Sequence, residues 1–205
     1  MLRYKSMALS TPYTIGLTGG IGSGKSVVSC LLRLMEVPVY DCDREAKRLM
    51  LQNAEIRTAL IDIAGDDVYL EDGQLNRAHL AAFMFGNAKR VTQVNRIVHP
   101  VVRNDFKQWV KLQGKAIVAV ESAILFEAEM NADVDAVWVV HAPEDIRLKR
   151  AVLRDASNAE AVRSRMKSQK DEQEYIRRAD RVIYNDDSRS LIKQVKELLH
   201  EISAK

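Results

Sequence analysis

One glycine-rich loop constrains the fold of this chain more than any other feature of its sequence. Residues 16–28 read G-L-T-G-G-I-G-S-G-K-S-V-V, which places five glycines, one lysine and two serines within thirteen residues. From Gly19 onward, the register fits the pattern G-x-x-x-x-G-K-[ST] at each fixed position. Several glycines are needed where a backbone approaches an anion closely, because a Cβ excludes the required dihedral angles. The pattern therefore predicts a phosphate-binding loop rather than a simple glycine-rich turn.

The residues on either side of this loop have the order that such a site requires. Thr14–Thr18 is a short apolar run typical of a buried strand, and residues 27–35 are apolar enough for a helix packed on a sheet. The loop N–H groups and the positive end of the helix dipole then face the same anion. A lysine at this position reaches the β- and γ-phosphates, and the serine hydroxyl coordinates Mg²⁺. The residues expected to bind the nucleotide are Gly20, Gly22, Ser23, Gly24, Lys25, Ser26 and Val27.

Composition and charge narrow the class of protein. No apolar run reaches the roughly 18–20 residues that cross a membrane, and residues 1–12 lack the apolar core of a signal peptide. We expect a flexible extension there, with Met7 as an alternative start, in a cytoplasmic protein. Cys30 and Cys42 lack metal-ligand spacing, and Cys30 is expected to be a small buried side chain.

The positive charge of the chain is local. Residues 144–181 hold eleven Lys and Arg against eight Asp and Glu, so this segment contains the whole net charge of +3. This distribution argues against a nucleic-acid-binding surface and favours a local anionic ligand. Nothing in the sequence requires an oligomer.

Strand-like and helical stretches alternate along the chain. Five short apolar runs lack period-2 alternation, as expected for strands covered on both faces. They are Thr14–Thr18, Val37–Tyr40, Ala116–Val120, Ala136–His141 and Arg181–Tyr184. The alternation predicts an α/β fold with a central parallel sheet flanked by helices. Residues 41–115 have helical periodicity and are too numerous for one crossover, so we expect a helical insertion there.

Ligands of open α/β sheets bind at the carboxyl ends of the strands, where Asp41 and Asp43 follow the second predicted strand. If this spacing stays extended, both side chains point to the same side. One carboxylate can then bind Mg²⁺ through water while the other accepts a proton from an attacking hydroxyl. The alternative is helix capping, for which Asp-x-Asp is also suitable. We favour catalysis, more strongly for Asp43.

This reasoning does not decide the roles of three other residues. His99 either contacts substrate or ends a helix before Pro100, and the residues alone favour the structural role. Glu121 ends a predicted strand near the expected metal position. Glu127 either holds a substrate hydroxyl or caps a helix.

Eight Lys and Arg residues lie between positions 147 and 170. Arginines on a closing lid can stabilise the charge that spreads over a transferring phosphoryl group. Arg154 and Arg165 are the candidates for that role. The remaining six, including Arg147 and Lys149, are expected to be solvated surface.

Taken together, these motifs resemble the dephospho-coenzyme A kinase family, whose members catalyse the last step of coenzyme A synthesis. Beyond the loop, the resemblance rests on D-C-D at 41–43, G-Q-L-N-R at 73–77, I-V-H-P-V-V at 97–102, I-L-F-E at 124–127, L-K-R-A-V-L-R-D at 148–155, R-M-K-S-Q at 165–169 and A-D-R-V-I-Y-N at 179–185. They occur in family order and cover nearly all of the chain after Tyr13. The chain departs from the pattern at Ala123, where the family commonly has proline.

The resemblance implies a reaction and a role for each matching residue. ATP and Mg²⁺ would be the cofactors and dephospho-coenzyme A the substrate. Asp43 would be the base for the ribose 3′-hydroxyl, Lys25, Arg154 and Arg165 would serve transfer, and Asn185 would lie near adenine. Mg²⁺ would be held by Ser26 and Asp41. The expected substrate-side residues are Asp41, Arg77, His99 and Glu127.

The resemblance also implies three parts. The nucleotide-binding core would comprise residues 13–42, 115–143 and 181–205, the helical acceptor domain 43–114, and the lid 144–180. Two other functions compete with this one. A kinase for a nucleoside or nucleotide acceptor would use the same chemistry. A GTPase-type switch would need an N-K-x-D motif, which is absent, and its only D-x-x-G, at 62–65, lies in a helix-like stretch.

Overall fold

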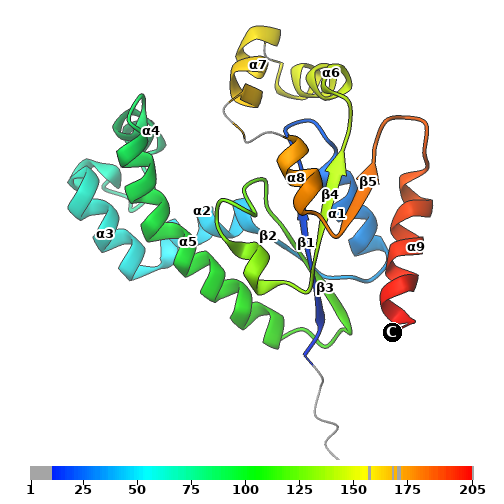
Figure 1. Cartoon of the computed structure of the whole chain (residues 1–205). Coiled ribbons are helices and arrows are strands. Elements are labelled where there is room, and N and C mark those ends of the chain that lie inside the picture. The colour runs from blue at the N-terminus through cyan, green and yellow to red at the C-terminus, as the bar shows by residue number, and fades with distance from the viewer. Residues whose placement is uncertain (1–10, 157, 168, 170–171, 205) are drawn as a thin grey trace, which may run out of the picture. The chain divides into compact units, whose positions relative to one another are not determined.

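The computed structural model describes residues 11–156, 158–167, 169 and 172–204, so most of the expected N-terminal extension lies outside the described residues. The chain forms two compact units (Figure 1). The first comprises Met1–Val39 and Val110–Lys205, and the second is Tyr40–Trp109. No helix in the described part is long and apolar enough to cross a membrane.

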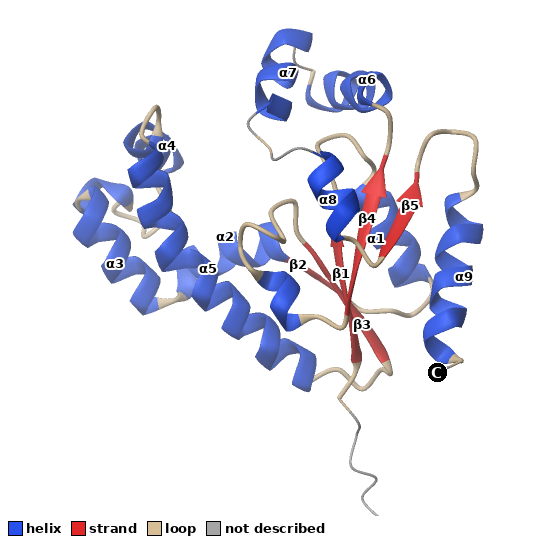
Figure 2. Ribbon diagram, in the orientation of Figure 1, coloured by secondary structure: helices blue, strands red, loops and turns tan. Residues whose placement is uncertain are grey.

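A five-stranded sheet with the order β2-β3-β1-β4-β5 organises the first unit (Figure 2). The strands are β1 (Tyr13–Thr18), β2 (Val39–Asp41), β3 (Ile117–Glu121), β4 (Ala136–His141) and β5 (Arg181–Tyr184). Strand β1 pairs in parallel with both β3 and β4, and β4 pairs in parallel with β5. The predicted α/β class and all five strands are confirmed, with bounds that shift by at most two residues. The central place of β1 brings the loop that follows it between the ends of β3 and β4.

Helices on both faces of the sheet bury its apolar side chains. Helices α1 (Lys25–Leu34) and α9 (Leu191–Ser203) lie side by side, and α8 (Glu172–Arg178) covers the other face (Figure 2). Ile15, Leu17 and Trp138 form the core with Val28 of α1 and Val195 of α9. The segment after β4 forms α6 (Glu144–Asp155) and α7 (Ala159–Lys167). Between β3 and β4, η2 (Met130–Asp133) is a short 3₁₀ helix.

The second unit is helical. Its elements are α2 (Cys42–Gln52), α3 (Ala54–Ala64), η1 (Asp66–Val68), α4 (Arg77–Met84) and α5 (Ala88–Lys111), whose last residues continue beyond the unit. Tyr40 packs against Phe106 and Trp109, with ring centroids 5.4 and 5.5 Å away. The Tyr40 hydroxyl donates to Asp105, which also accepts two hydrogen bonds from Arg48. This network joins α2 to α5 at one end of the unit.

Two local expectations were wrong. A helix does not end at His99, because α5 continues through His99 and Pro100. Proline removes one helical hydrogen bond, but the buried row Val94, Val98, Val102 and Phe106 keeps the helix packed on both sides of it. Cys30 is exposed rather than buried, since α1 turns its Val28 and Leu32 face inward; Cys42 is the buried cysteine.

Candidate active site

The glycine-rich loop runs from the end of β1 to the start of α1 and requires glycine at two positions. Gly22 and Gly24 have φ angles of +77° and +99°, which side chains rarely adopt. A Cβ on Gly22 would lie 2.2 Å from the carbonyl oxygen of Arg147, and one on Gly24 would lie 2.1 Å from Asn185 Nδ2. The loop backbone is therefore packed directly against α6 and against the side chain of Asn185, the residue after β5.

The loop and the positively charged start of α1 line a cavity of about 200 Å³. The Lys25 Nζ donates to the carbonyl oxygens of Gly19 and Gly20 at 2.7 and 3.3 Å. Ser26 is exposed in the first turn of α1, where unpaired helical N–H groups favour an anion. The cavity is lined by Gly22, Gly24, Lys25, Ser26, Val27, Arg150, Ala151 and Arg154. Five of the seven predicted nucleotide-binding positions of the loop, all except Gly20 and Ser23, thus line this cavity.

Asn185 joins the end of β5 to the loop. Its Nδ2 donates to the carbonyl oxygen of Ser23 at 2.7 Å, and its backbone N–H donates to the carbonyl oxygen of His141 at 2.7 Å. Arg150 donates to the Asn185 carbonyl oxygen at 3.0 Å. The side chain that the family resemblance assigned to adenine therefore also supports the second half of the loop.

Arg147 supports the first half of the loop, although it was expected to be solvated. It is 8% exposed, its Nε donates to the Ala142 carbonyl oxygen at 3.0 Å, and it forms a 3.0 Å ion pair with Glu172. The other Glu172 oxygen lies 3.2 Å from His141 Nδ1, a contact whose angles do not make a hydrogen bond. A buried arginine needs such a partner, because an unpaired buried charge is costly. Charge counting could not identify this residue, since burial depends on the fold.

Gln169 was also missed as a loop contact. The Ile21 N–H donates to Gln169 Oε1 at 2.8 Å. Gln169 lies within the R-M-K-S-Q motif, which was the only sequence signal for it. Arg147 and Gln169 thus hold the Gly20–Gly22 portion, while Asn185 holds Ser23.

Arg154 and Arg165, the two arginines expected to act from a lid, share one carboxylate. Asp155 accepts from Arg154 Nε at 2.7 Å and from Arg165 at 2.8 Å. These hydrogen bonds lower the pKa of Asp155 to about 2, so the cluster stays charged throughout the neutral range. Arg154 lines the cavity beside Lys25, whereas Arg165 does not line it. Of the two, the geometry therefore places Arg154 nearer the expected phosphates.

Replacing Arg154 or Arg165 with alanine should reduce turnover more than stability. Both side chains are about half exposed or more, at 62% and 48%, and exposed ion pairs contribute at most about 1 kcal/mol. We expect kcat to fall roughly tenfold or more, since cationic groups stabilise phosphoryl-transfer charge, with the larger loss for Arg154→Ala. Parallel measurements of kcat and Tm test this. A lower Tm with unchanged kcat would make both residues structural.

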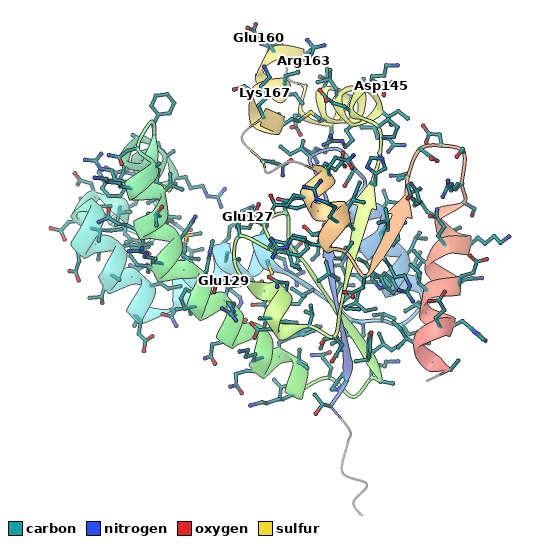
Figure 3. The ribbon with its side chains drawn as sticks, viewed as in Figure 1. Glu127, Glu129, Asp145, Glu160, Arg163 and Lys167 are labelled. Atoms are coloured by element: carbon teal, nitrogen blue, oxygen red, sulfur yellow. The ribbon has the colours of Figure 1, made fainter. Side chains whose placement is uncertain are left out.

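Two carboxylates near the sheet already have partners in the first unit. Glu121, the last residue of β3, accepts a hydrogen bond from the Ser29 hydroxyl of α1. Glu127 (Figure 3) accepts at its Oε1 from the Tyr175 hydroxyl of α8 at 2.7 Å. Within the described residues, the buried Glu127 Oε2 has no hydrogen-bond partner. Burial, followed by this hydrogen bond to Glu127, raises the pKa of Tyr175.

The remaining predicted residues belong to the second unit. Asp41 ends β2 and caps α2, because its Oδ1 accepts from the Arg44 N–H at 3.0 Å. The extended Asp-x-Asp arrangement is therefore wrong: the helix begins at Cys42, and Asp43 lies exposed in its first turn. Arg77 is the exposed first residue of α4. His99 is half-buried within α5, and this burial lowers its pKa.

Comparison with known proteins identifies the family. A family model described as dephospho-CoA kinase matches residues 13–190. The chain belongs to the dephospho-CoA kinase family. A dephospho-CoA kinase of Porphyromonas gingivalis is 45% identical over 193 residues, covering 94% of this chain and 95% of the relative. One from Bacteroides fragilis is 43% identical over 186 residues, covering 90% of each chain.

Solved structures agree with the fold. A crystal structure from Thermus thermophilus has a TM-score of 0.81 at 31% identity, covering 94% of this chain and 98% of that one. A shikimate kinase from Acinetobacter baumannii has a TM-score of 0.55 at 19% identity, covering 96% of both chains. This second likeness concerns the fold alone. The chain is thus an enzyme with the P-loop kinase fold, and its family membership, rather than that fold, indicates the acceptor.

Proposed function

We propose that this chain transfers the γ-phosphoryl group of ATP to the ribose 3′-hydroxyl of dephospho-CoA, which yields CoA and ADP. The observation that carries the proposal is the loop from β1 to α1, with Lys25 and Ser26 at one cavity, in a chain that matches the dephospho-CoA kinase family from residue 13 to 190. The loop supplies the phosphate site, and the family membership indicates the acceptor.

The loop residues bind and orient the phosphates. Backbone N–H groups of the loop and the N-terminus of α1 provide donors and positive potential for the phosphate oxygens. Lys25 Nζ, which donates to loop carbonyls at 2.7 and 3.3 Å, exchanges these partners for phosphate oxygens when the nucleotide binds. Its charge then stabilises the transition state, in which negative charge spreads over the transferred group.

The residues present fit Mg²⁺ held mainly by the nucleotide. Mg²⁺ in kinases usually takes phosphate oxygens, waters and one or two protein oxygens. The exposed Ser26 hydroxyl supplies one such oxygen, and no cluster of three acidic, His or Cys side chains occurs in the described part of the chain. When bound, the ion neutralises charge on the phosphates. Ser26 is the proposed ligand, with Asp41 acting through water.

The acceptor side of the proposal rests on residues matched to the family. Asp43 accepts the proton of the 3′-hydroxyl, and its exposure leaves its carboxylate accessible. Arg77, His99 and Glu127 hold parts of dephospho-CoA, and Asn185 lies near the adenine of ATP. His99 suits an uncharged contact, because burial lowers its pKa and keeps it neutral at neutral pH.

Formation of CoA tests the proposal directly. The protein should convert dephospho-CoA to CoA in the presence of ATP and Mg²⁺, with a mass increase that corresponds to one phosphoryl group. ADP should form in equal amount, and only when the acceptor is present. Phosphorylation of a nucleoside or nucleotide in place of dephospho-CoA would instead identify a kinase with another acceptor. Triphosphate hydrolysis that is independent of any acceptor would contradict kinase function.

A further inference from the structure

Two separate cavities adjoin the phosphate loop. The smaller one, of about 200 Å³, contains Lys25 and Ser26 and is the proposed phosphate site of ATP. The larger one, of about 630 Å³, adjoins the loop at Gly20. Its other lining residues come from the end of β4, from α6 and α7, from Gln169 and from α8. The two cavities share none of their described lining residues. The larger cavity is therefore available to a second ligand.

Two cations on α7 face this larger cavity. Arg163 and Lys167 (Figure 3) are four residues apart on α7, so they lie on the same side of the helix. Both line the cavity. Within the described residues, neither side chain has an ion pair or a hydrogen bond. Arg165, on the same helix, is instead paired with Asp155. The helix thus has one neutralised cation and two cations available for a ligand.

The cavity is also lined by a buried arginine that has fixed partners. Arg147 is buried beside Gly20 and is fixed by Glu172 and by the Ala142 carbonyl oxygen, each at 3.0 Å. A Cβ on Gly20 would lie 2.4 Å from Arg147 Nη1, which shows how closely the guanidinium approaches the loop. The lining contains three cations, Arg147, Arg163 and Lys167, and two carboxylates, Glu144 and Glu172. Glu172 already pairs with Arg147. The other charged lining residues are Arg163, Lys167 and Glu144, so their net charge is positive.

We propose that the larger cavity binds the diphosphate of the acceptor, with Arg163 and Lys167 as its ligands. The inference rests on the proposed function, because dephospho-CoA carries a diphosphate between its adenosine and pantetheine parts. Planar guanidinium and ammonium groups bind phosphate oxygens through charge-assisted hydrogen bonds. The phosphates of ATP are assigned to the smaller cavity with Lys25, so an anion in the larger cavity belongs to the other substrate. Arg163 and Lys167 are then specificity-determining residues.

Removal of the two charges tests this site. We expect Arg163→Gln and Lys167→Gln each to raise the KM for dephospho-CoA about three- to tenfold, and the double variant about 30-fold, since 1.4 kcal/mol corresponds to a factor of ten. The KM for ATP should change less than twofold. Titration calorimetry with dephospho-CoA should show the same loss of affinity without turnover. Added KCl should weaken binding by the parent more than by the double variant, because salt screens exposed charges.

Lys149→Gln is the matched control. Lys149 is an exposed cation of α6 that lines neither cavity, so it makes the same change in charge without touching the site. Its KM values should stay at the parent level, and all variants should keep the parent Tm within about 2 °C, as is usual for surface substitutions. Unchanged affinity for dephospho-CoA in the double variant would overturn the subsite, and so would a selective rise in the KM for ATP. If the parent neither binds nor phosphorylates dephospho-CoA, the proposed function fails together with the subsite.

Discussion

Lys25→Ala should reduce phosphoryl transfer by roughly 10²- to 10³-fold while the protein stays folded. The removed ammonium group stabilises charge that develops in the transition state, and loss of one such preorganised donor costs about 10²–10³ in kcat. Lys25 Nζ donates to the loop carbonyl oxygens of Gly19 and Gly20, and Lys25 is not part of the buried hydrophobic core of the described residues. Turnover with saturating ATP and dephospho-CoA, together with circular dichroism and Tm, checks both parts of the expectation.

A second lysine separates this effect from a general loss of charge. Lys115 forms an exposed ion pair with Glu36 at 2.7 Å and lies outside the loop. Lys115→Ala should therefore keep parental turnover. Lys25→Gln retains a hydrogen-bond donor for the loop carbonyls but lacks the charge, so it should be nearly as inactive as Lys25→Ala. Recovery of most activity in Lys25→Gln would show that the lysine mainly shapes the loop, and parental activity in Lys25→Ala would contradict the phosphate-site assignment.

The features that sequence could predict are those that depend on local pattern. The strands at Ala136–His141 and Arg181–Tyr184 have the predicted bounds, because buried parallel strands are uninterrupted apolar runs. The loop was also predictable, since its glycines meet a backbone requirement that is local to the loop. Gly22 and Gly24 have the left-handed conformations that such a loop needs. In both cases the sequence signal lies within a few consecutive residues.

The features that sequence could not predict depend on partners far apart in the chain. Arg147 is buried because Glu172, which is distant in sequence, pairs with it at 3.0 Å. An isolated arginine in a charged helix gives no sign of this pairing. Arg163 and Lys167 are exposed, as expected, but the cavity that they line could not be predicted, because it forms only when α7 and the start of α8 approach the loop. Tertiary contacts, rather than composition, therefore distinguish these three cations from the other Lys and Arg residues of the same segment.

The prediction of an extended Asp-x-Asp segment was wrong because an extended backbone competes there with the start of a helix. In an extended backbone, alternate side chains share one face, which suggested that both aspartates point to the same ligand. Capping of α2 by Asp41 stabilises the helix from Cys42 onward, so Asp41 and Asp43 have different surroundings. Asp41 accepts a backbone N–H, whereas Asp43 is exposed and, within the described residues, has no hydrogen-bond partner. This difference supports different roles for the two carboxylates.

Asp43→Asn should lower kcat roughly 10²-fold or more, the scale expected when a general base is lost. A ribose hydroxyl is a poor nucleophile at neutral pH, and the amide cannot accept its proton as attack proceeds. The substitution keeps the size of the side chain, and loss of one charge from the first turn of α2 costs the helix only about 0.3–1 kcal/mol. ATP affinity should be nearly unchanged. Steady-state kinetics with each substrate varied, and nucleotide binding measured by calorimetry, check both expectations.

Asp41→Asn is the matched comparison, because asparagine caps helices about as well as aspartate and so preserves the start of α2. Asp41 is the proposed metal-side carboxylate, so its substitution should raise the Mg²⁺ concentration needed for half-maximal activity. Excess Mg²⁺ should restore much of the turnover of this variant. Excess Mg²⁺ should not restore turnover to Asp43→Asn, since the missing function there is proton acceptance. If Mg²⁺ rescues Asp43→Asn but not Asp41→Asn, the base is Asp41 and the metal-side residue is Asp43. Normal turnover by Asp43→Asn would exclude it as the base.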